Sequence, residues 1–269
     1  MKAANTGLAD PDDPVTVFVA SWGRPLYLWA CLDALHRLTR TAARIVLLDN
    51  AHPDPLVGEV IAGFERRGLF AEVVRFSTNA FDNIRNAYRE RLAGIGPLHI
   101  YLESDCVIQP AAGCWLAEMR RIMRDHPGIG VLGSLIDPAD FVPPAEAVAL
   151  AGGDPAAAAF LAKLGSPERA FRDAPEWADA KREFFLTEPP CPIHNPPGRL
   201  MMLRTQVMQQ LGFQLDNALA ALVRGRGLQP AVTARVRHRH LSLLNIYDYP
   251  GYDESVRQGF FHPPGPRGT

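Results

Sequence analysis

The chain has 269 residues, of which 47% are hydrophobic and 21% are charged, so it can bury a substantial core. Its formal net charge of -1 excludes a global basic field of the kind that attracts nucleic acid, and no nucleic-acid partner is expected. No apolar run approaches the roughly 20 residues that a membrane-spanning helix needs, so no transmembrane segment is predicted.

The cysteines and the N-terminus bear on the cellular compartment. Four cysteines occur, and none forms a CxxC pair: Cys31, Cys106, Cys114 and Cys191. Residues 1–14 are polar and acidic, without the basic start and apolar stretch of an export signal. We therefore expect reduced thiols, a cytoplasmic location and an N-terminal tail over residues 1–14.

Strand and helix patterns alternate through the first half of the chain. Short β-prone apolar runs predict strands over 15–20, 44–48, 71–76 and 98–102. Apolar residues at helical spacing predict helices over 27–38, 56–67 and 81–93. Such alternation is typical of βαβ units, so we predict an α/β protein with a mostly parallel sheet flanked by helices.

The regular pattern dissolves over residues 137–197, which are rich in Ala, Pro and Gly. Short helical patterns and aromatic residues that need burial indicate a helical insertion there. Regular elements resume afterwards, with a strand over 199–203, helices over 206–211 and 216–226, and a last strand over 231–236.

Polar residues gather where the predicted strands end. In open parallel α/β sheets, ligands bind beyond the carboxyl ends of the strands. The segments at those ends are Ser21 to Arg24, Asp49 with Asn50, Asn79, and Glu103 to Asp105. The sequence therefore predicts a ligand site along this edge of the sheet.

Two motifs point to a divalent metal. Glu103 and Asp105 directly follow the fourth strand, where both carboxylates can reach one ligand such as Mg²⁺ or Mn²⁺. His238 and His240 lie on one face if the last strand continues through them, and imidazole is a good ligand for Mn²⁺. Each motif alone is also compatible with a role that involves no metal. The acids can belong to a solvated loop, and the histidines can belong to a basic, solvent-facing strand end.

Motifs of several other enzyme classes are missing from the sequence. It contains no GxSxG nucleophile elbow, no Walker loop and no GxGxxG after the first strand. The sequence therefore does not favour a dehydrogenase or a P-loop enzyme.

Taken together, these segments resemble the family 2 glycosyltransferases of the GT-A (Rossmann-like) fold. VTVFVASWGRPLYLWACLDAL is similar to that family's first strand, nucleotide-binding loop and helix, and RIVLLDNAHPDP to its second strand. STNAFDNIRNAYRERL is similar to a segment that lines the nucleotide pocket, and LHIYLESDCVI to the strand that carries the DXD metal motif. GRLMMLRTQVMQQLGF and LDNALAALVRGRG resemble the strand and helices of the acceptor side.

The resemblance implies an inverting, metal-dependent transfer of a sugar from a UDP-, GDP- or dTDP-sugar to an acceptor hydroxyl. It implies that Mn²⁺ or Mg²⁺ is held by Asp105 and by His240 or His238. It also makes Asp216, which opens a helix, the catalytic base. The residues expected at the nucleotide sugar are Ser21, Trp22, Arg24, Asp49, Asn79, Arg85, Glu103 and Ser104.

The same resemblance divides one GT-A domain into parts. Residues 15–136 bind the nucleotide sugar, residues 137–197 form the insertion near the acceptor site, and residues 198–269 form the acceptor side with the metal-binding segment and a tail. The family's DXD motif begins here with Glu103, and Leu215 replaces the Glu of a Glu-Asp pair. No QxxRW motif occurs, which disfavours a processive polysaccharide synthase.

Two other functions remain open at this stage. One is a sugar-nucleotide nucleotidyltransferase, which also uses a metal and a related sheet. The other is a degenerate, non-catalytic sugar-binding module, because Glu103 and Leu215 depart from the family's pattern. The sequence leaves the sugar, the nucleobase, the acceptor and the oligomeric state undetermined.

Overall fold

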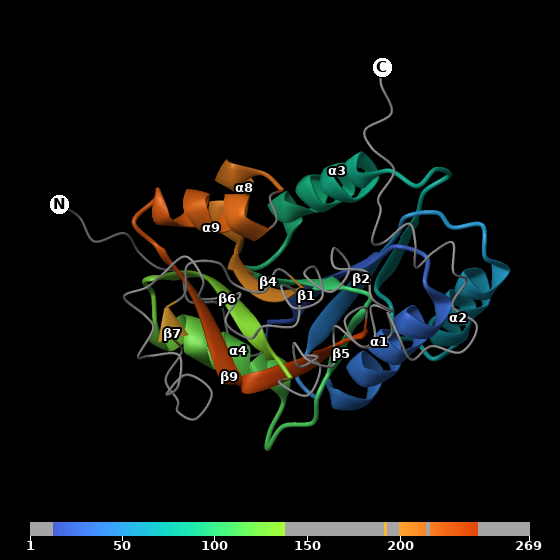
Figure 1. Cartoon of the computed structure of the whole chain (residues 1–269), viewed down its shortest axis with the longest axis horizontal. Helices are drawn as coiled ribbons and strands as arrows, with labels where there is room; N and C mark the ends of the chain where they lie inside the picture. The colour runs from blue at the N-terminus through green and yellow to red at the C-terminus, as the bar shows by residue number, and fades with distance from the viewer. Residues whose placement is uncertain (1–12, 138–190, 193–198, 214–215, 242–269) are drawn as a thin grey trace, which may run out of the picture.

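A computed structural model describes residues 13–137, 191–192, 199–213 and 216–241 of the chain (Figure 1). At 191–192 and 216–217 it describes the backbone alone. The predicted insertion over 137–197, the N-terminal tail and the tail after the last strand therefore lie almost wholly outside the described residues.

The first half of the chain consists of alternating strands and helices, as the sequence predicts. Proline and a capping carboxylate begin two of the helices: Pro25 opens the first, and Asp54 accepts a hydrogen bond from the Leu56 amide (2.9 Å) before the second. The elements are β1 Val15–Ser21, α1 Pro25–Leu38, β2 Ala43–Asp49, α2 Pro55–Arg66, β3 Glu72–Arg75, α3 Phe81–Arg91, η1 Leu92–Gly94 and β4 Leu98–Glu103.

The second half has a less regular order of elements. After β4 come β5 Cys106–Ile108, α4 Trp115–Asp125, β6 Ile129–Ile136, β7 Cys191–Pro192, β8 Leu200–Arg204, α8 Thr205–Leu211, α9 Asp216–Arg224 and β9 Gln229–His240. The sequence patterns do not predict β5, α4 or β6. They also predict that the last strand ends at residue 236, whereas β9 continues through both histidines.

All of these strands form one sheet, in the order β3-β2-β1-β4-β8-β6-β9-β5, with β7 paired to β9. The strands β3, β2, β1 and β4 are parallel to one another, as expected for βαβ units. Beyond β4 the pairing is mixed: β6 is parallel to β9, whereas β8 is antiparallel to both β4 and β6, and β5 is antiparallel to β9. The parallel prediction therefore holds for the first half of the sheet.

Helices cover both faces of the sheet, and the alternation along β1 shows how. Val17 and Val19 pack in one buried cluster with residues of α1, α2 and α4. Phe18 and Ala20 pack in a second cluster with residues of α3, α8 and α9. Figure 1 shows α3, α8 and α9 above the sheet in that view. Both faces are thus buried, which explains the continuously apolar strand β1.

A buried hydrogen-bond chain joins the two halves beneath α3 and α8. Thr205 Oγ1 donates to the Gly96 carbonyl (2.6 Å), so it accepts from Nδ1 of His99 (2.9 Å). Nε2 of His99 then accepts the hydroxyl hydrogen of Tyr88 (2.5 Å). Burial lowers the pKa of His99 to about 3, so the imidazole is neutral in the folded protein.

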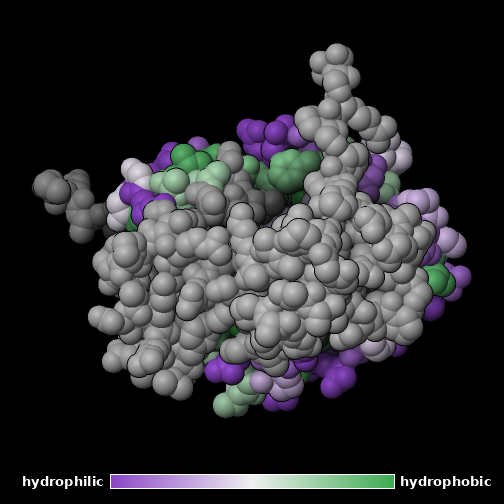
Figure 2. Space-filling model, in the orientation of Figure 1, coloured by the Kyte–Doolittle hydropathy of each residue, from purple (hydrophilic) through white to green (hydrophobic). Residues whose placement is uncertain are grey.

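The described part of the surface carries both hydrophobic and hydrophilic side chains. In Figure 2, hydrophobic and hydrophilic side chains mix along the upper rim, over α3, α8 and α9. Phe81 of α3 and Leu222 of α9 are among the exposed large hydrophobic residues. Among the described residues, no helix is both long enough and apolar enough to span a bilayer. In the part of the chain that the structure describes, the thiols of Cys31, Cys106 and Cys114 are free.

Candidate active site

The carboxyl ends of β1 and β2 bring two predicted site residues side by side. Ser21 and Asp49 are in register in the parallel pair. Ser21 Oγ and Asp49 Oδ1 are both buried and have no hydrogen-bond partner among the described residues. Burial raises the pKa of Asp49, although Arg75 and His52 oppose the shift. Unsatisfied buried oxygens are costly in a folded protein, so they mark a place where a bound ligand can supply the partner.

Asn50, one residue further on, is fully buried and fixes the neighbouring loop. Its amide nitrogen donates to Oδ1 of Asn79 (3.1 Å). Its Oδ1 accepts from the Ala80 amide (3.1 Å) and from Nδ2 of Asn83 (3.2 Å). This network holds the start of α3 against the end of β2, and it places Asn79 at the predicted edge.

The loop after β1 presents an aromatic ring to α3. The rings of Trp22 and Phe81 have centroids 6.3 Å apart and planes within 11° of each other. Phe81 in turn packs edge-on against Phe213 (5.6 Å). Gly23 has φ +79, and a Cβ there would lie 2.1 Å from the His52 ring, so the loop needs glycine at this position.

Glu103 is the last residue of β4, and its side chain lies against an arginine that comes just before a strand much later in the sequence. Its carboxylate forms an ion pair with Arg199, which precedes β8, and its amide donates to the Arg199 carbonyl (2.9 Å). The amide of buried Ser104 donates to the Ala20 carbonyl (3.0 Å) and ties the motif to β1. Glu103 is thus engaged with arginine, which leaves the second acid of the motif for another partner.

That second acid, Asp105, meets one of the two predicted histidines. Its Oδ2 lies 3.3 Å from Nε2 of His240 and 3.6 Å from Nη1 of Arg24. Asp105 and His240 are both buried, and the Leu241 amide donates to the Asp105 carbonyl (2.8 Å). The antiparallel pairing of β5 with β9, in which Cys106 faces His240, produces this contact. One residue of each motif, Asp105 and His240, is therefore brought into contact by this strand pairing.

His238 lies beside this pair but has a different partner. Its Nδ1 is 2.6 Å from Oγ of Ser134 on β6. Its Nε2 is buried and has no hydrogen-bond partner among the described residues. Burial, and then the neighbouring His240, lower the pKa of His238 to about 3. The imidazole is therefore neutral, which is the form that coordinates metals.

The remaining predicted residues are less closely tied to this edge. Arg85 pairs with Asp82 (3.1 Å) one turn away on α3, while its Nε is buried without a partner in the described part of the chain. Asp216 is the first residue of α9, as predicted, but its side chain lies outside the described residues, as does Leu215.

As a metal site, the described residues offer a small set of donors. They contain no group of three His, Cys, Asp or Glu side chains that could hold a metal ion. Asp105 and His240 supply one carboxylate and one imidazole, with Arg24 beside them. Such an arrangement suits a ligand that brings its own negative charge and its own oxygen donors, such as a diphosphate with its cation.

No protein-family model matches this sequence, and no curated protein matches it. Solved structures do match its fold. The mannosyltransferase PcManGT from Pyrobaculum calidifontis, in complex with GDP-Man and Mn²⁺, has a TM-score of 0.56 at 15% identity, covering 86% of this chain and 58% of that chain. GalNAc-T7, with UDP, GalNAc and Mn²⁺, has a TM-score of 0.56 at 14% identity, covering 86% of this chain and 44% of that chain. The chain has the GT-A fold.

A third GT-A structure extends this comparison. TarS 1-349 from S. aureus, in complex with UDP-GlcNAc, has a TM-score of 0.50 at 14% identity, covering 85% of this chain and 60% of that chain. The chain thus spans between 44% and 60% of the length of these three proteins. At such low identity the likeness establishes the fold, which is the one that the sequence resemblance predicts.

At this edge of the GT-A sheet, Arg199 and Ser134 are not predicted from the sequence, and Asn50 is predicted to lie at a strand end but without a role. Arg199 is the partner of Glu103, Ser134 holds His238, and Asn50 organises the loop before α3. Asn50 directly follows the second predicted strand, so its position was a usable signal. Arg199 and Ser134 carry no local signal, because each meets its partner only through pairing with a distant strand.

Proposed function

We propose that this chain is a glycosyltransferase that moves a sugar from a nucleotide-diphosphate sugar to an acceptor hydroxyl, with inversion at the anomeric carbon. The observation that carries the proposal is the contact between Asp105 Oδ2 and His240 Nε2 (3.3 Å) at the carboxyl edge of a GT-A sheet. The structural neighbours named above were solved with nucleotides or nucleotide sugars. The cytoplasmic location remains a prediction from the sequence.

A divalent metal fits the residues present at this edge. Asp105 and His240 would hold Mn²⁺ or Mg²⁺, and the diphosphate with water would complete the coordination, as is usual for hard cations with few protein ligands. When bound, the ion neutralises the charge that develops on the leaving diphosphate. Arg24, at 3.6 Å from Asp105, can place a second positive charge beside the same phosphates.

The ends of β1 and β2 are proposed to bind the nucleoside. Ser21 Oγ and Asp49 Oδ1 each offer a buried oxygen to ribose or base hydrogens. Trp22, together with Phe81, offers an aromatic surface for the base. Asn79 and Arg85 at the start of α3 border the same edge, while Glu103 and Ser104 close it at β4.

Asp216 is proposed as the base that takes the proton of the acceptor hydroxyl. The hydroxyl is a poor nucleophile at neutral pH, so a fixed carboxylate is needed as the bond to the sugar forms. Asp216 begins α9, where the helix dipole stabilises a carboxylate. In this proposal residues 15–136 bind the donor, residues 198–269 serve the acceptor side and the metal, and residues 137–197 border the acceptor.

The direct test is a product assay. The purified protein is incubated with UDP-, GDP- and dTDP-sugars, with Mn²⁺ or Mg²⁺ or with a chelator, and the released nucleotide is identified. Metal-dependent release of a nucleoside diphosphate supports the proposal. Release of pyrophosphate instead identifies a nucleotidyltransferase. Binding of a sugar without any turnover identifies a non-catalytic module.

A further inference from the structure

The pairing of β6 with β9 contains an irregularity just before the histidines. Ser134 pairs with Thr233, but the next residue of β6, Leu135, pairs with Arg237. β9 therefore carries a bulge over residues 234–236, and Figure 1 shows the strand bending sharply. Bulges bend a strand and redirect the side chains that follow, and they are common beside active sites.

The bulge reverses which face of the sheet the later residues occupy. Side chains alternate between faces, so residues an odd number apart lie on opposite faces of a regular strand. Ala231, before the bulge, and Val236, its last residue, are five positions apart but nevertheless belong to the same buried cluster. His238 and His240 follow Val236 at even spacing, so the bulge places them on the face from which His240 meets Asp105.

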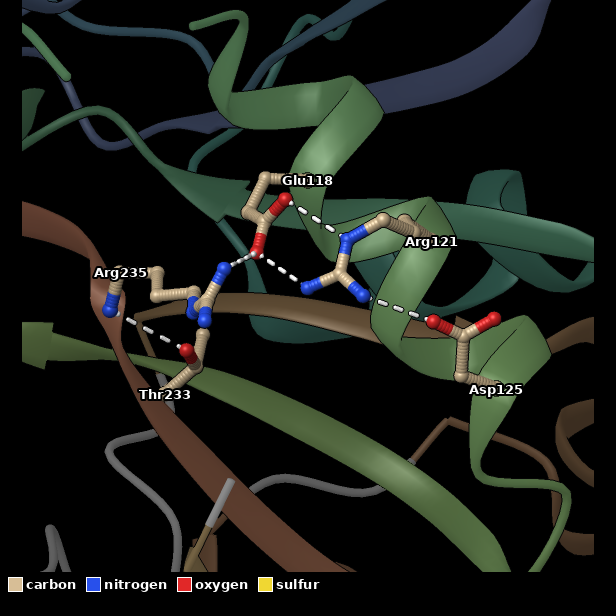
Figure 3. Close-up of polar contacts among 5 residues, drawn as sticks. All are labelled: Glu118, Arg121, Asp125, Thr233 and Arg235. Carbon is tan, nitrogen blue, oxygen red and sulfur yellow. Dashed lines mark hydrogen bonds and ion pairs between the residues drawn. The ribbon is translucent and has the colours of Figure 1, made fainter. Parts of the chain in front are cut away.

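A set of polar contacts fixes this bulge (Figure 3). Within β9, the Arg235 amide donates to Oγ1 of Thr233 (3.1 Å). The Arg235 guanidinium donates to Oε1 of Glu118 on α4 (3.3 Å). Arg121 also donates to both oxygens of Glu118 (3.0 and 2.7 Å), and it pairs with Asp125 (2.7 Å).

Glu118 is well suited to hold Arg235 at neutral pH. Hydrogen bonds from Arg121 chiefly lower the pKa of Glu118, and Arg235 contributes to the same shift despite the opposing effect of burial. The carboxylate is therefore ionised and accepts from two arginines at once. Because residues of α4 and of β9 pack in the same buried cluster, this contact joins the bulge to a helix that is held by the core.

We propose that Glu118 and Arg235 are positioning residues, which hold the β9 bulge so that His238 and His240 face Asp105. The inference rests on the proposed function only where it concerns the metal, since the orientation of the imidazoles is a property of the metal-free protein. The hydrogen bonds described above join Glu118 and Arg235 to each other, to Arg121 and to the bulged segment at Thr233, so both residues act through the backbone of β9.

The test compares Glu118→Gln and Arg235→Ala with Asp125→Asn. Asp125→Asn removes one negative charge from the same helix but leaves the contact between Glu118 and Arg235 intact. Two quantities are measured at fixed pH: the imidazole ¹⁵N shifts of His238 and His240 without metal, and the affinity for Mn²⁺ from the free-ion EPR signal with a nucleoside diphosphate present. Thermal unfolding confirms that each variant is folded.

We expect Glu118→Gln and Arg235→Ala to move both imidazole signals and to weaken Mn²⁺ affinity about three- to tenfold. This is less than the loss of about 10- to 100-fold expected when a group that hydrogen-bonds a metal ligand is removed. The double variant should be no weaker than either single one, and Asp125→Asn should match the wild type. Unchanged signals in Glu118→Gln, or an equal effect of Asp125→Asn, would overturn the proposal. Moved signals in a protein that binds no Mn²⁺ would support the positioning role and reject the metal site.

Discussion

The first half of the sheet, β3-β2-β1-β4, is built from consecutive strand–helix units, whereas the second half, β8-β6-β9-β5, joins segments that are far apart in the chain. The first half brings Ser21 and Asp49 together simply because parallel strands end at one edge. The second half brings His240 to Asp105 only through the antiparallel pair of β5 and β9. Donor-side residues therefore depend on local folding, and metal-side residues depend on long-range pairing.

The substitution Asp216→Asn should have the largest effect, and it separates turnover from the binding of donor and metal by the two halves of the sheet. If Asp216 is the base, turnover should fall by about 10²–10⁴-fold, because the acceptor hydroxyl loses its proton acceptor. Donor binding should be unchanged, since neither half of the sheet is altered. Steady-state kinetics and donor titration measure the two quantities, with Asn217→Ala as the neighbouring control. Retained turnover would remove Asp216 from the mechanism.

Asp105→Ala removes one of the two proposed metal ligands and leaves the proposed nucleoside site unchanged. The variant loses the carboxylate that faces His240, so the Mn²⁺-dependent part of donor binding should weaken at least about 100-fold. Donor binding without metal should persist, because the ends of β1 and β2 are intact. Calorimetric titration with and without Mn²⁺ measures both, and Asp33→Ala on α1 serves as an acidic control. Equal metal dependence in the variant and the wild type would argue against this site.

Lowering the pH tests two buried imidazoles. His99 lies in the hydrogen-bond chain between Tyr88 and Thr205, and His238 lies beside the contact of Asp105 with His240. Burial lowers both pKa values to about 3, whereas the unfolded chain takes up these protons near 6.5. Stability is therefore complete above pH 6.5 and is lost as the pH falls toward 3. Each histidine should cost roughly 2 kcal/mol between pH 7 and pH 5.

Urea unfolding at the two pH values measures this loss, and His238→Asn should remove about half of it. A variant that loses as much stability as the wild type would show that His238 takes up its proton while folded.

Asn50→Ala disturbs only the proposed nucleoside site, at the ends of β1 and β2 and the start of α3. Its effect on donor binding should be the smallest of those predicted here. Removal of the amide leaves Asn79 Oδ1 and the Ala80 amide without their partner, which should cost about 1–3 kcal/mol of unfolding free energy. Donor affinity should fall as the start of α3 loosens, and the metal side should be unaffected. Denaturant unfolding gives the stability, with Asn79→Ala as a milder control. A loss of Mn²⁺ affinity as large as that of donor affinity would contradict the separation of the two sides.

The sequence by itself determined the first half of the sheet. Apolar strands alternate with amphipathic helices there, so each element and its polar end can be recognised from neighbouring residues, as for Ser21, Asp49 and Glu103. It also predicted that Asp105 and the late histidines converge, but only through resemblance to a known family. The composition alone gave no reason for residues 105 and 240 to meet.

Only the tertiary structure decided which histidine faces Asp105 and what holds it there. The strand β5 is short and β9 carries a bulge, so neither the pairing of Cys106 with His240 nor the reversal of faces can be inferred from alternation along the chain. The contacts of Glu118 with Arg235 and of Ser134 with His238 likewise join distant segments. A sequence pattern reports neighbours along the chain, whereas these residues become neighbours only after the sheet has formed.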